Sequence, residues 1–143
     1  DNKKNHVFCL LSDAEQQEGQ TWEAYMFATH HRLNNLTFII DDNHIQISGK
    51  TQAVMSLGNL KLKLIAFGLQ VLEMDAHDFV DIQKKLQQAK DNKQHTVAII
   101  AHSTPGKGVS FMENDYRWHG RAPNKQEFES AMQELRIKKQ QLS

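Results

Sequence analysis

The stretch HVFCLLSDAEQQEGQTWEA, residues 6–24, contains the pattern that decides the fold. Its first part, HVFCLL (6–11), is continuously apolar, which is typical of a strand covered on both faces of a parallel sheet. From about Glu18 to Leu33 the apolar residues recur with helical spacing. Asp13 therefore lies between a predicted strand and a predicted helix, whose amino end favours an anion. The stretch predicts a binding site at the C-terminal end of a buried strand.

The rest of the chain repeats this alternation of strands and helices. We predict strands at 36–41, 69–75 and 95–102, helices at 57–68, 78–92 and 125–141, and a polar loop at 103–124. Short connections between them indicate an α/β fold, a mostly parallel doubly wound sheet with helices on both faces. Four strands make a thin sheet, so we expect residues 1–143 to be a single domain segment of a larger α/β unit or one part of a split protein.

Composition excludes several classes of partner. Lys and Arg number 17, as do Asp and Glu, so no overall charge favours nucleic acid or an anionic membrane. The apolar runs are too short to cross a bilayer. The single cysteine, Cys9, is predicted to be a buried strand residue, and it cannot form an internal disulfide. This favours a reducing compartment, which we take to be the cytoplasm. The eight histidines show no zinc-ligand spacing.

Asp13 and Asn43 each follow a predicted buried strand. The carboxyl ends of parallel strands meet at one edge of a sheet, where ligands collect. Carboxylate and amide oxygens are the hard donors that Mg²⁺ accepts when phosphates complete its octahedron. The alternative interpretation is structural, because Asp often caps a helix and Asn often occupies a turn. The spacing alone leaves both open.

Three longer segments carry a resemblance to a known family. SDAEQQEGQTWEAYMFATHHRLNNLTFIIDDNHIQISG (12–49) resembles the thiamine-diphosphate motif of transketolases, which runs from Gly-Asp-Gly through Glu-Gly and Trp-Glu-Ala to Asp-x-Asn. LGNLKLKLIAFGLQVLEMDAHD (57–78) is similar to the family's Ala-Phe-Gly and Asp-Gly-His-Asp run. GKGVSFMENDYRWHGRAPN (106–124) resembles its Trp-His-Gly loop. The resemblance covers residues 6–130 and is to part of the N-terminal, diphosphate-binding (PP) domain.

The resemblance implies a cofactor and a reaction. The cofactor is thiamine diphosphate, held through Mg²⁺ or Ca²⁺, and the reaction is transfer of a two-carbon ketol unit between sugar phosphates, as in the pentose phosphate pathway. Asp13 and Asn43 would bind the metal with side-chain oxygens and Ile45 with its carbonyl oxygen. Ala14 would offer its backbone N–H to the diphosphate.

The resemblance also implies roles for three further side chains. His119, in the predicted active-site loop 103–124, would lie beside the reactive thiazolium, contact the substrate and assist proton transfer. Glu18 and Glu23 would lie at a dimer interface and connect two cofactor sites. Without the resemblance, His119 is a loop histidine and the two glutamates belong to a solvated first helical turn.

Four positions depart from the family pattern around the cofactor. Ser12 and Ala14 replace both glycines of Gly-Asp-Gly, Ala76 replaces the glycine of Asp-Gly-His, and Pro105 stands where many members carry a lysine. A side chain can clash where backbone approaches phosphate closely, and at positive φ it adds strain of about 1 kcal/mol. We therefore expect weakened rather than abolished binding of thiamine diphosphate.

The family's activity needs parts outside these 143 residues. As the partner we expect a pyrimidine-binding transketolase domain or subunit, in a homodimer or heterotetramer with apolar contact surfaces, and we expect no catalysis by this chain alone. The alternative function is a diverged, non-catalytic transketolase-like module that serves assembly or regulation. A generic nucleotide-binding domain has no support, because the sequence has neither a Walker loop nor Gly-x-Gly-x-x-Gly.

Overall fold

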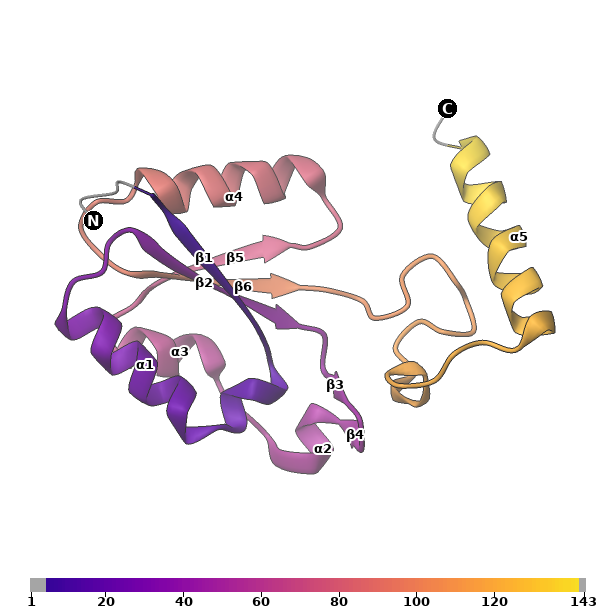
Figure 1. Ribbon diagram of the computed structural model, residues 1–143, viewed down its shortest axis with the longest axis horizontal. Coiled ribbons are helices and arrows are strands. Elements are labelled where there is room, and N and C mark those ends of the chain that lie inside the picture. Colours follow the sequence, from indigo (N-terminus) through magenta and orange to yellow (C-terminus); the bar gives the residue numbers. More distant parts are fainter. Residues whose placement is uncertain (1–4, 142–143) are drawn as a thin grey trace.

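A computed structural model describes residues 5–141, so the outermost residues of the predicted 1–143 segment lie outside it. Its centre is a four-stranded sheet in the order β1 (Val7–Ser12), β2 (Leu36–Asp42), β6 (Val97–His102), β5 (Gln70–Asp75) (Figure 1). All three strand pairings are parallel. Parallel pairing requires crossover connections, which the helices provide. The predicted α/β class is confirmed.

Helices cover both faces of this sheet (Figure 1). Helices α1 (Gly19–His30) and α3 (Leu60–Ala66) pack on one face, and α4 (Phe79–Asp91) packs on the other. Alternate residues of the central strand β6 supply the two cores, because successive strand side chains point to opposite faces. Ala98 and Ile100 join Tyr25 of α1 in one core, whereas Val97 and Ile99 join Ala89 of α4 in the other.

Several short elements follow the strand ends and were not predicted from the sequence. A 3₁₀ helix, η1 (Ala14–Gln17), follows β1 directly, and a second one, η2 (Tyr116–Trp118), lies in the long loop. After β2 the chain forms an antiparallel pair, β3 (Ile45–Gln46) and β4 (Gly49–Lys50), and then helix α2 (Thr51–Met55). These elements are too short to show a period in the sequence.

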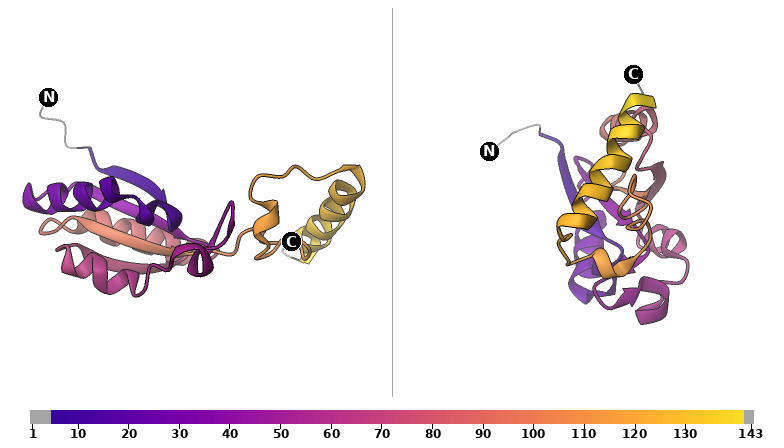
Figure 2. Two further views of the ribbon diagram at one scale, coloured as in Figure 1. Left: turned by 90° about the horizontal axis from the view of Figure 1, so that it is seen from below. Right: turned by 90° about the vertical axis from the view of Figure 1, so that its right-hand side faces the viewer.

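Beyond β6, the loop 103–124 and helix α5 (Lys125–Gln141) extend away from the sheet past the C-terminal ends of its strands (Figures 1 and 2). Helix α5 packs on the loop, where the backbone N–H and hydroxyl of Ser110 donate to Glu134 at 2.7 and 2.8 Å. Gly106 has φ +72°, and a Cβ there would lie 2.7 Å from the backbone of Met112. The loop turn at this position therefore requires glycine.

The prediction that the first strand is buried on both faces is wrong. Strand β1 pairs only with β2 and forms an edge of the sheet, where Phe8 and Leu10 keep 41% and 71% of their surface exposed. Cys9 is half-buried rather than buried. A continuous apolar run predicts that other residues cover both faces of a strand. The described residues leave the side chains of Phe8 and Leu10 on β1 exposed. None of the helices within residues 5–141 has the length and apolar character needed to span a lipid bilayer.

Candidate functional site

The segment Asp42–Ile45, at the end of β2, separates two pockets. The first, which we name the Asp13 pocket, has a volume of about 680 Å³ and is lined by Asp13, Asp42, His44 and Thr51 among others. The second, the His119 pocket, has a volume of about 210 Å³ and is lined by Asn43, Ile45, Pro105 and His119 among others. Asp42 and His44 thus line the first pocket, and Asn43 and Ile45 line the second.

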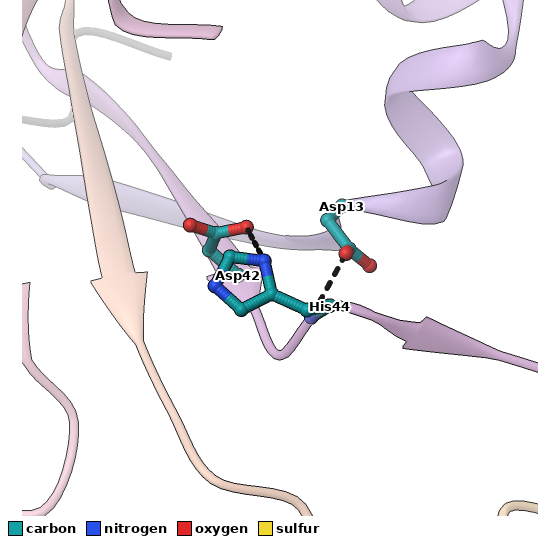
Figure 3. Close-up of side chains that lie close together, drawn as sticks. All are labelled: Asp13, Asp42 and His44. Carbon is teal, nitrogen blue, oxygen red and sulfur yellow. Dashed lines mark hydrogen bonds and ion pairs between the residues drawn. The ribbon is translucent and has the colours of Figure 1, made fainter. Parts of the chain in front are cut away.

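Asp13 is the most deeply buried acid of the site, with 1% of its surface exposed. Its Oδ2 accepts a hydrogen bond from the His44 backbone N–H at 3.1 Å (Figure 3) and another from the Thr51 hydroxyl at 2.8 Å. Its Oδ1 is buried and has no hydrogen-bond partner among the described residues. Burial raises the pKa of this carboxyl, against the Thr51 hydrogen bond and a contact with the backbone N–H of Ala14. A buried carboxylate oxygen without a partner is costly unless a ligand such as a cation satisfies it.

The turn that presents Asp13 is held by a capping box. Glu15 Oε2 accepts from the backbone N–H and hydroxyl of Ser12 at 2.7 and 3.0 Å, and the Ser12 hydroxyl accepts from the Glu15 N–H at 3.1 Å. This reciprocal pair satisfies the free donors at the start of η1. Ser12 therefore has a structural role of its own, for which Ser-x-x-Glu was the available sequence signal.

A buried hydrogen-bond network fixes η1 against α1. Gln16 is 2% exposed, accepts from the Tyr25 hydroxyl at 2.7 Å, and donates to the Ser12 carbonyl at 2.9 Å. The Trp22 indole N–H donates to the Gln16 carbonyl at 2.8 Å. Burial raises the pKa of Tyr25 far above its ordinary value, so its hydroxyl remains a donor. The network holds the Asp13 turn in place from the side of the helix.

A chain of charged side chains crosses the Asp13 pocket. The Nδ1 and Nε2 atoms of His102 lie 3.2 Å from Asp42 Oδ2 and 3.0 Å from Glu73 Oε2. His44 Nδ1 lies 3.2 Å from Asp42 Oδ1, and Lys61 Nζ lies 2.5 Å from Glu73 Oε1. Hydrogen bonds from Lys61 and His102 lower the pKa of Glu73. Asp42, Glu73 and His102 lie on three different strands, and Lys61 lies on α3. The sequence does not predict this row of side chains, because only the strand order brings them together.

The His119 pocket is built from the loop 103–124 and the far side of the same segment. Asn43 donates from Nδ2 to Asp41 Oδ2 at 2.9 Å and accepts at Oδ1 from the Ile45 N–H at 3.0 Å. His119 is exposed, and its backbone N–H closes η2 by donating to the Tyr116 carbonyl at 3.0 Å. The pocket therefore brings three predicted site residues together: Asn43, Ile45 and His119.

The remaining predicted site residues lie at the Asp13 turn and on its helix. Of the predicted metal ligands, Asp13 lines the Asp13 pocket and Asn43 and Ile45 line the His119 pocket, while the backbone N–H of His44, between the last two, donates to Asp13 at 3.1 Å. Glu18 is an exposed residue between η1 and α1, so the helix begins at Gly19 rather than Glu18. Glu23 is exposed on α1.

Ala14 is the first residue of η1. Neither it nor Ser12 is among the described residues with positive φ, so the expected backbone strain at the two replaced glycines does not arise. The reason is that Ser12 ends strand β1 in extended conformation and Ala14 begins the right-handed 3₁₀ helix, and any residue adopts either conformation. Only the close approach of these side chains to a phosphate remains as a cost.

A parallel α/β sheet with a buried, partly unpaired carboxylate at its strand ends defines a domain that binds a charged ligand along that edge. The particular family follows from comparison with known proteins. The family model described as "Transketolase, thiamine diphosphate binding domain" matches residues 1–142, and the chain belongs to this family.

Relatives of known name agree with this membership. The chain is 39% identical over 129 residues to a subunit of the apulose-4-phosphate transketolase of Phocaeicola vulgatus, covering 90% of this chain and 46% of the relative. It is 35% identical to a subunit of the 6-deoxy-6-sulfo-D-fructose transketolase of a Clostridium species, covering 94% of this chain and 49% of the relative. The chain thus spans about half the length of these curated relatives.

A solved structure shows the same fold. The transketolase of Campylobacter jejuni matches with a TM-score of 0.85 and 32% identity, over 92% of this chain and 21% of that one.

The residues present fit a divalent cation at the Asp13 turn. Asp13 offers a hard, unpaired oxygen, and one ligand atom from each of Asp13, Asp42 and His44 lies within 4.8 Å of the others (Figure 3). A divalent cation at Asp13 would satisfy the unpaired oxygen and offset the cost of burying its charge.

Proposed function

We propose that this chain is the diphosphate-binding part of a transketolase-like enzyme that transfers a two-carbon ketol unit between sugar phosphates. The observation that carries the proposal is the unpaired, buried Oδ1 of Asp13 at the C-terminal end of β1, in a chain of the transketolase family. Family membership supports thiamine diphosphate as the cofactor, which when bound supplies a thiazolium that stabilises a carbanion.

Asp13, Asn43 and Ile45 would hold the divalent cation, Mg²⁺ or Ca²⁺, with two side-chain oxygens and one carbonyl oxygen. All three follow the ends of β1 and β2, which are neighbours in the sheet. The N–H of Ala14, at the start of η1, is proposed as a donor to the diphosphate. This assignment requires the Asn43 amide oxygen to bind the cation while it also accepts the hydrogen bond from the Ile45 N–H.

His119 would act on the substrate side of the site, in a proposed active-site loop at 103–124. Its exposed imidazole lines the same pocket as Asn43 and Ile45, which supports a role in holding or moving a proton there. The neighbouring Trp118 is anchored by its indole N–H to the Phe111 carbonyl at 3.0 Å, and Arg121 stacks on its ring at 4.2 Å. These contacts give the histidine a defined starting position.

A partner completes the proposed enzyme. Two relatives are named as subunits of transketolases, which supports a pyrimidine-binding domain or subunit in the role of that partner, within a homodimer or heterotetramer. The exposed apolar side chains of edge strand β1 support a contact surface there. Glu18 and Glu23, both exposed near the Asp13 turn, are proposed to lie at the dimer interface.

The experiment is calorimetric titration of thiamine diphosphate into the chain reconstituted with its pyrimidine-binding partner, with and without Mg²⁺. We expect Mg²⁺-dependent binding that Asp13→Asn abolishes and Glu129→Gln, on exposed α5, leaves unchanged. Absence of binding under both conditions would overturn the proposal.

The alternative is a diverged, non-catalytic module, favoured by Ser12, Ala14, Ala76 and Pro105 at the cofactor positions. The double change Ser12→Gly with Ala14→Gly separates the two functions. A tenfold or larger gain in cofactor affinity, about 1.4 kcal/mol, identifies a degraded site. Unchanged affinity means that the site tolerates both side chains.

A further inference from the structure

We propose that Arg121 makes the His119 pocket an anion-binding site, in which its guanidinium holds a phosphate group of a ligand. The inference rests on the proposed function only for the source of that phosphate, which is either the diphosphate of the cofactor or the phosphate of a sugar substrate. It goes beyond the family resemblance, which gives Arg121 no role.

The first support is the charge of the residues that line the pocket. Their charged side chains are those of Asp115 and Arg121, and His119 adds an imidazole. The Asp115 carboxylate is already paired, because it accepts from Arg117 Nε at 2.9 and 3.0 Å and from Arg117 Nη2 at 2.6 Å. These hydrogen bonds also lower the pKa of Asp115. Among the described residues of the lining, the positive charge of Arg121 is therefore left to face a ligand.

The second support is that the guanidinium of Arg121 is held in place. Its Cζ lies 4.2 Å from the centroid of the Trp118 ring, and its Nη2 donates to Glu127 Oε1. Glu127 is itself fixed by a capping box at the start of α5, since its Oε2 accepts from the Asn124 N–H at 2.8 Å and its own N–H donates to Asn124 Oδ1 at 3.0 Å. An arginine that is already ordered loses less conformational entropy when a ligand binds to it.

Glu127 takes up only part of the hydrogen-bonding capacity of Arg121. A guanidinium carries several N–H donors, and Nη2 is its one nitrogen with a hydrogen bond to another described residue. The side chain is 48% exposed, so a ligand has access to the remaining donors. Phosphate oxygens match this planar fork and accept parallel N–H bonds from it. Glu127 does not line the pocket, so its carboxylate leaves the space for an anion open.

The place of the pocket points to phosphate as the anion. Asn43 and Ile45, the proposed cation ligands, line it together with Arg121. Its volume of about 210 Å³ is smaller than the roughly 300–1,000 Å³ of pockets that enclose a whole small molecule, so it suits one end of a ligand. A guanidinium beside a divalent cation and a phosphate divides the phosphate charge with that cation.

The test uses the chain reconstituted with its pyrimidine-binding partner, in the presence of Mg²⁺. One calorimetric titration adds thiamine diphosphate to the cofactor-free complex, and a second adds inorganic phosphate to the complex saturated with cofactor. We expect Arg121→Gln to weaken one of these affinities by about tenfold or more, as the loss of charge-assisted hydrogen bonds does. A loss in the first titration assigns Arg121 to the cofactor diphosphate, and a loss in the second assigns it to the phosphate of the substrate.

Two further variants separate the role of the fork from that of charge alone. Arg121→Lys keeps the charge but not the planar fork, so it should retain part of the affinity that Arg121→Gln loses. Arg136→Gln is the matched control, because Arg136 is exposed on α5 and does not line the pocket. It removes the same charge and should change both affinities less than threefold.

Two results would overturn the inference: neither affinity falls in Arg121→Gln, or Arg136→Gln causes an equal loss. In both cases, Mg²⁺-dependent binding of thiamine diphosphate by the unchanged chain would leave the proposed function intact. Absence of that binding in the unchanged chain would instead overturn the proposed function, and the inference with it.

Discussion

The Asp13 pocket and the His119 pocket share one short segment but are built in opposite ways. The first is closed by side chains from the ends of β1, β2 and β6 and from β5, joined through carboxylates and rings. The second is lined mainly by residues of the loop 103–124. Strand ends hold their side chains on a rigid sheet, whereas a loop holds its side chains on backbone that can adjust. The following variants test whether the two pockets are separable.

The largest effect should come from Gly106→Ala in the loop. The change places a methyl group 2.7 Å from the Met112 backbone at a left-handed position, which we expect to cost more than about 2 kcal/mol locally. Hydrogen exchange should show faster exchange within residues 103–124, while exchange in β1 and β2 beside Asp13 stays the same. Gly120→Ala, where a Cβ meets nothing within 4 Å, is the control, and equal behaviour of the two would contradict the expected clash.

A smaller effect is expected from Tyr25→Phe, which changes the network that holds the Asp13 turn. Removing the hydroxyl leaves the Gln16 Oε1 buried without a donor and should lower the free energy of unfolding by about 1–3 kcal/mol. Urea denaturation measures this. Tyr116→Phe, at an exposed tyrosine of the loop, should change stability little. If both variants lose equal stability, the Gln16 network does not support the Asp13 turn.

Ser12→Ala should have a weaker effect than either. It removes the hydroxyl of the capping box with Glu15, and lost caps cost about 0.5–2 kcal/mol. Thermal unfolding should detect the loss. Ser110→Ala, which removes a hydroxyl bond to Glu134 in the loop region, serves as the matched change on the side of the His119 pocket. A melting temperature unaffected by Ser12→Ala would show that the box contributes nothing.

The smallest effect concerns pH and lies at the amino ends of the strands, away from both pockets. Burial, then Lys93 and Lys90, lower the pKa of His6 below its ordinary 6.5, and its Nε2 lies 2.8 Å from the Thr37 hydroxyl. The unfolded chain therefore binds a proton at this residue more readily than the folded chain does. Its contribution to stability is present above pH 6.5 and is lost as the pH falls through the folded pKa.

Unfolding free energies at pH 7.5 and pH 5 should differ less in His6→Ala than in the unchanged chain. Both values are compared with those of His30→Ala, which removes a histidine at the end of α1. An identical pH dependence in the His6 variant and the unchanged chain would rule out this linkage.

The sequence predicted the strands, the main helices and the position of Asp13, because apolar periodicity and strand-end polarity are local signals. It predicted a buried first strand, and the structure has an exposed edge, since cover depends on which segments lie beside β1. It did not predict the pairing of His44 with Asp42 or the chain through His102 to Glu73. His44 and Asp42 are neighbours in one segment but show no sequence pattern that marks them as a pair, whereas Asp42, His102 and Glu73 lie on separate strands that only the strand order brings together.

The predicted cation ligands stay a prediction. Asp13, Asn43 and Ile45 came from the family resemblance, and in the structure Asp13 lines one pocket while Asn43 and Ile45 line the other. A linear pattern records which residues are present but not which side of the chain each one faces. The capping Ser12 is different, because Ser-x-x-Glu is a local signal that the sequence does contain.

The alternation along Asp42–Ile45 has a consequence for how this protein can change over generations. A single-codon substitution in the segment alters the lining of one pocket and spares that of its neighbour, so the two pockets can change separately. Loss or gain of one codon there would displace the His44 N–H that donates to Asp13 and the Ile45 N–H that donates to Asn43, and so disturb both pockets at once. We expect natural variation in this segment to consist of substitutions, at a fixed length.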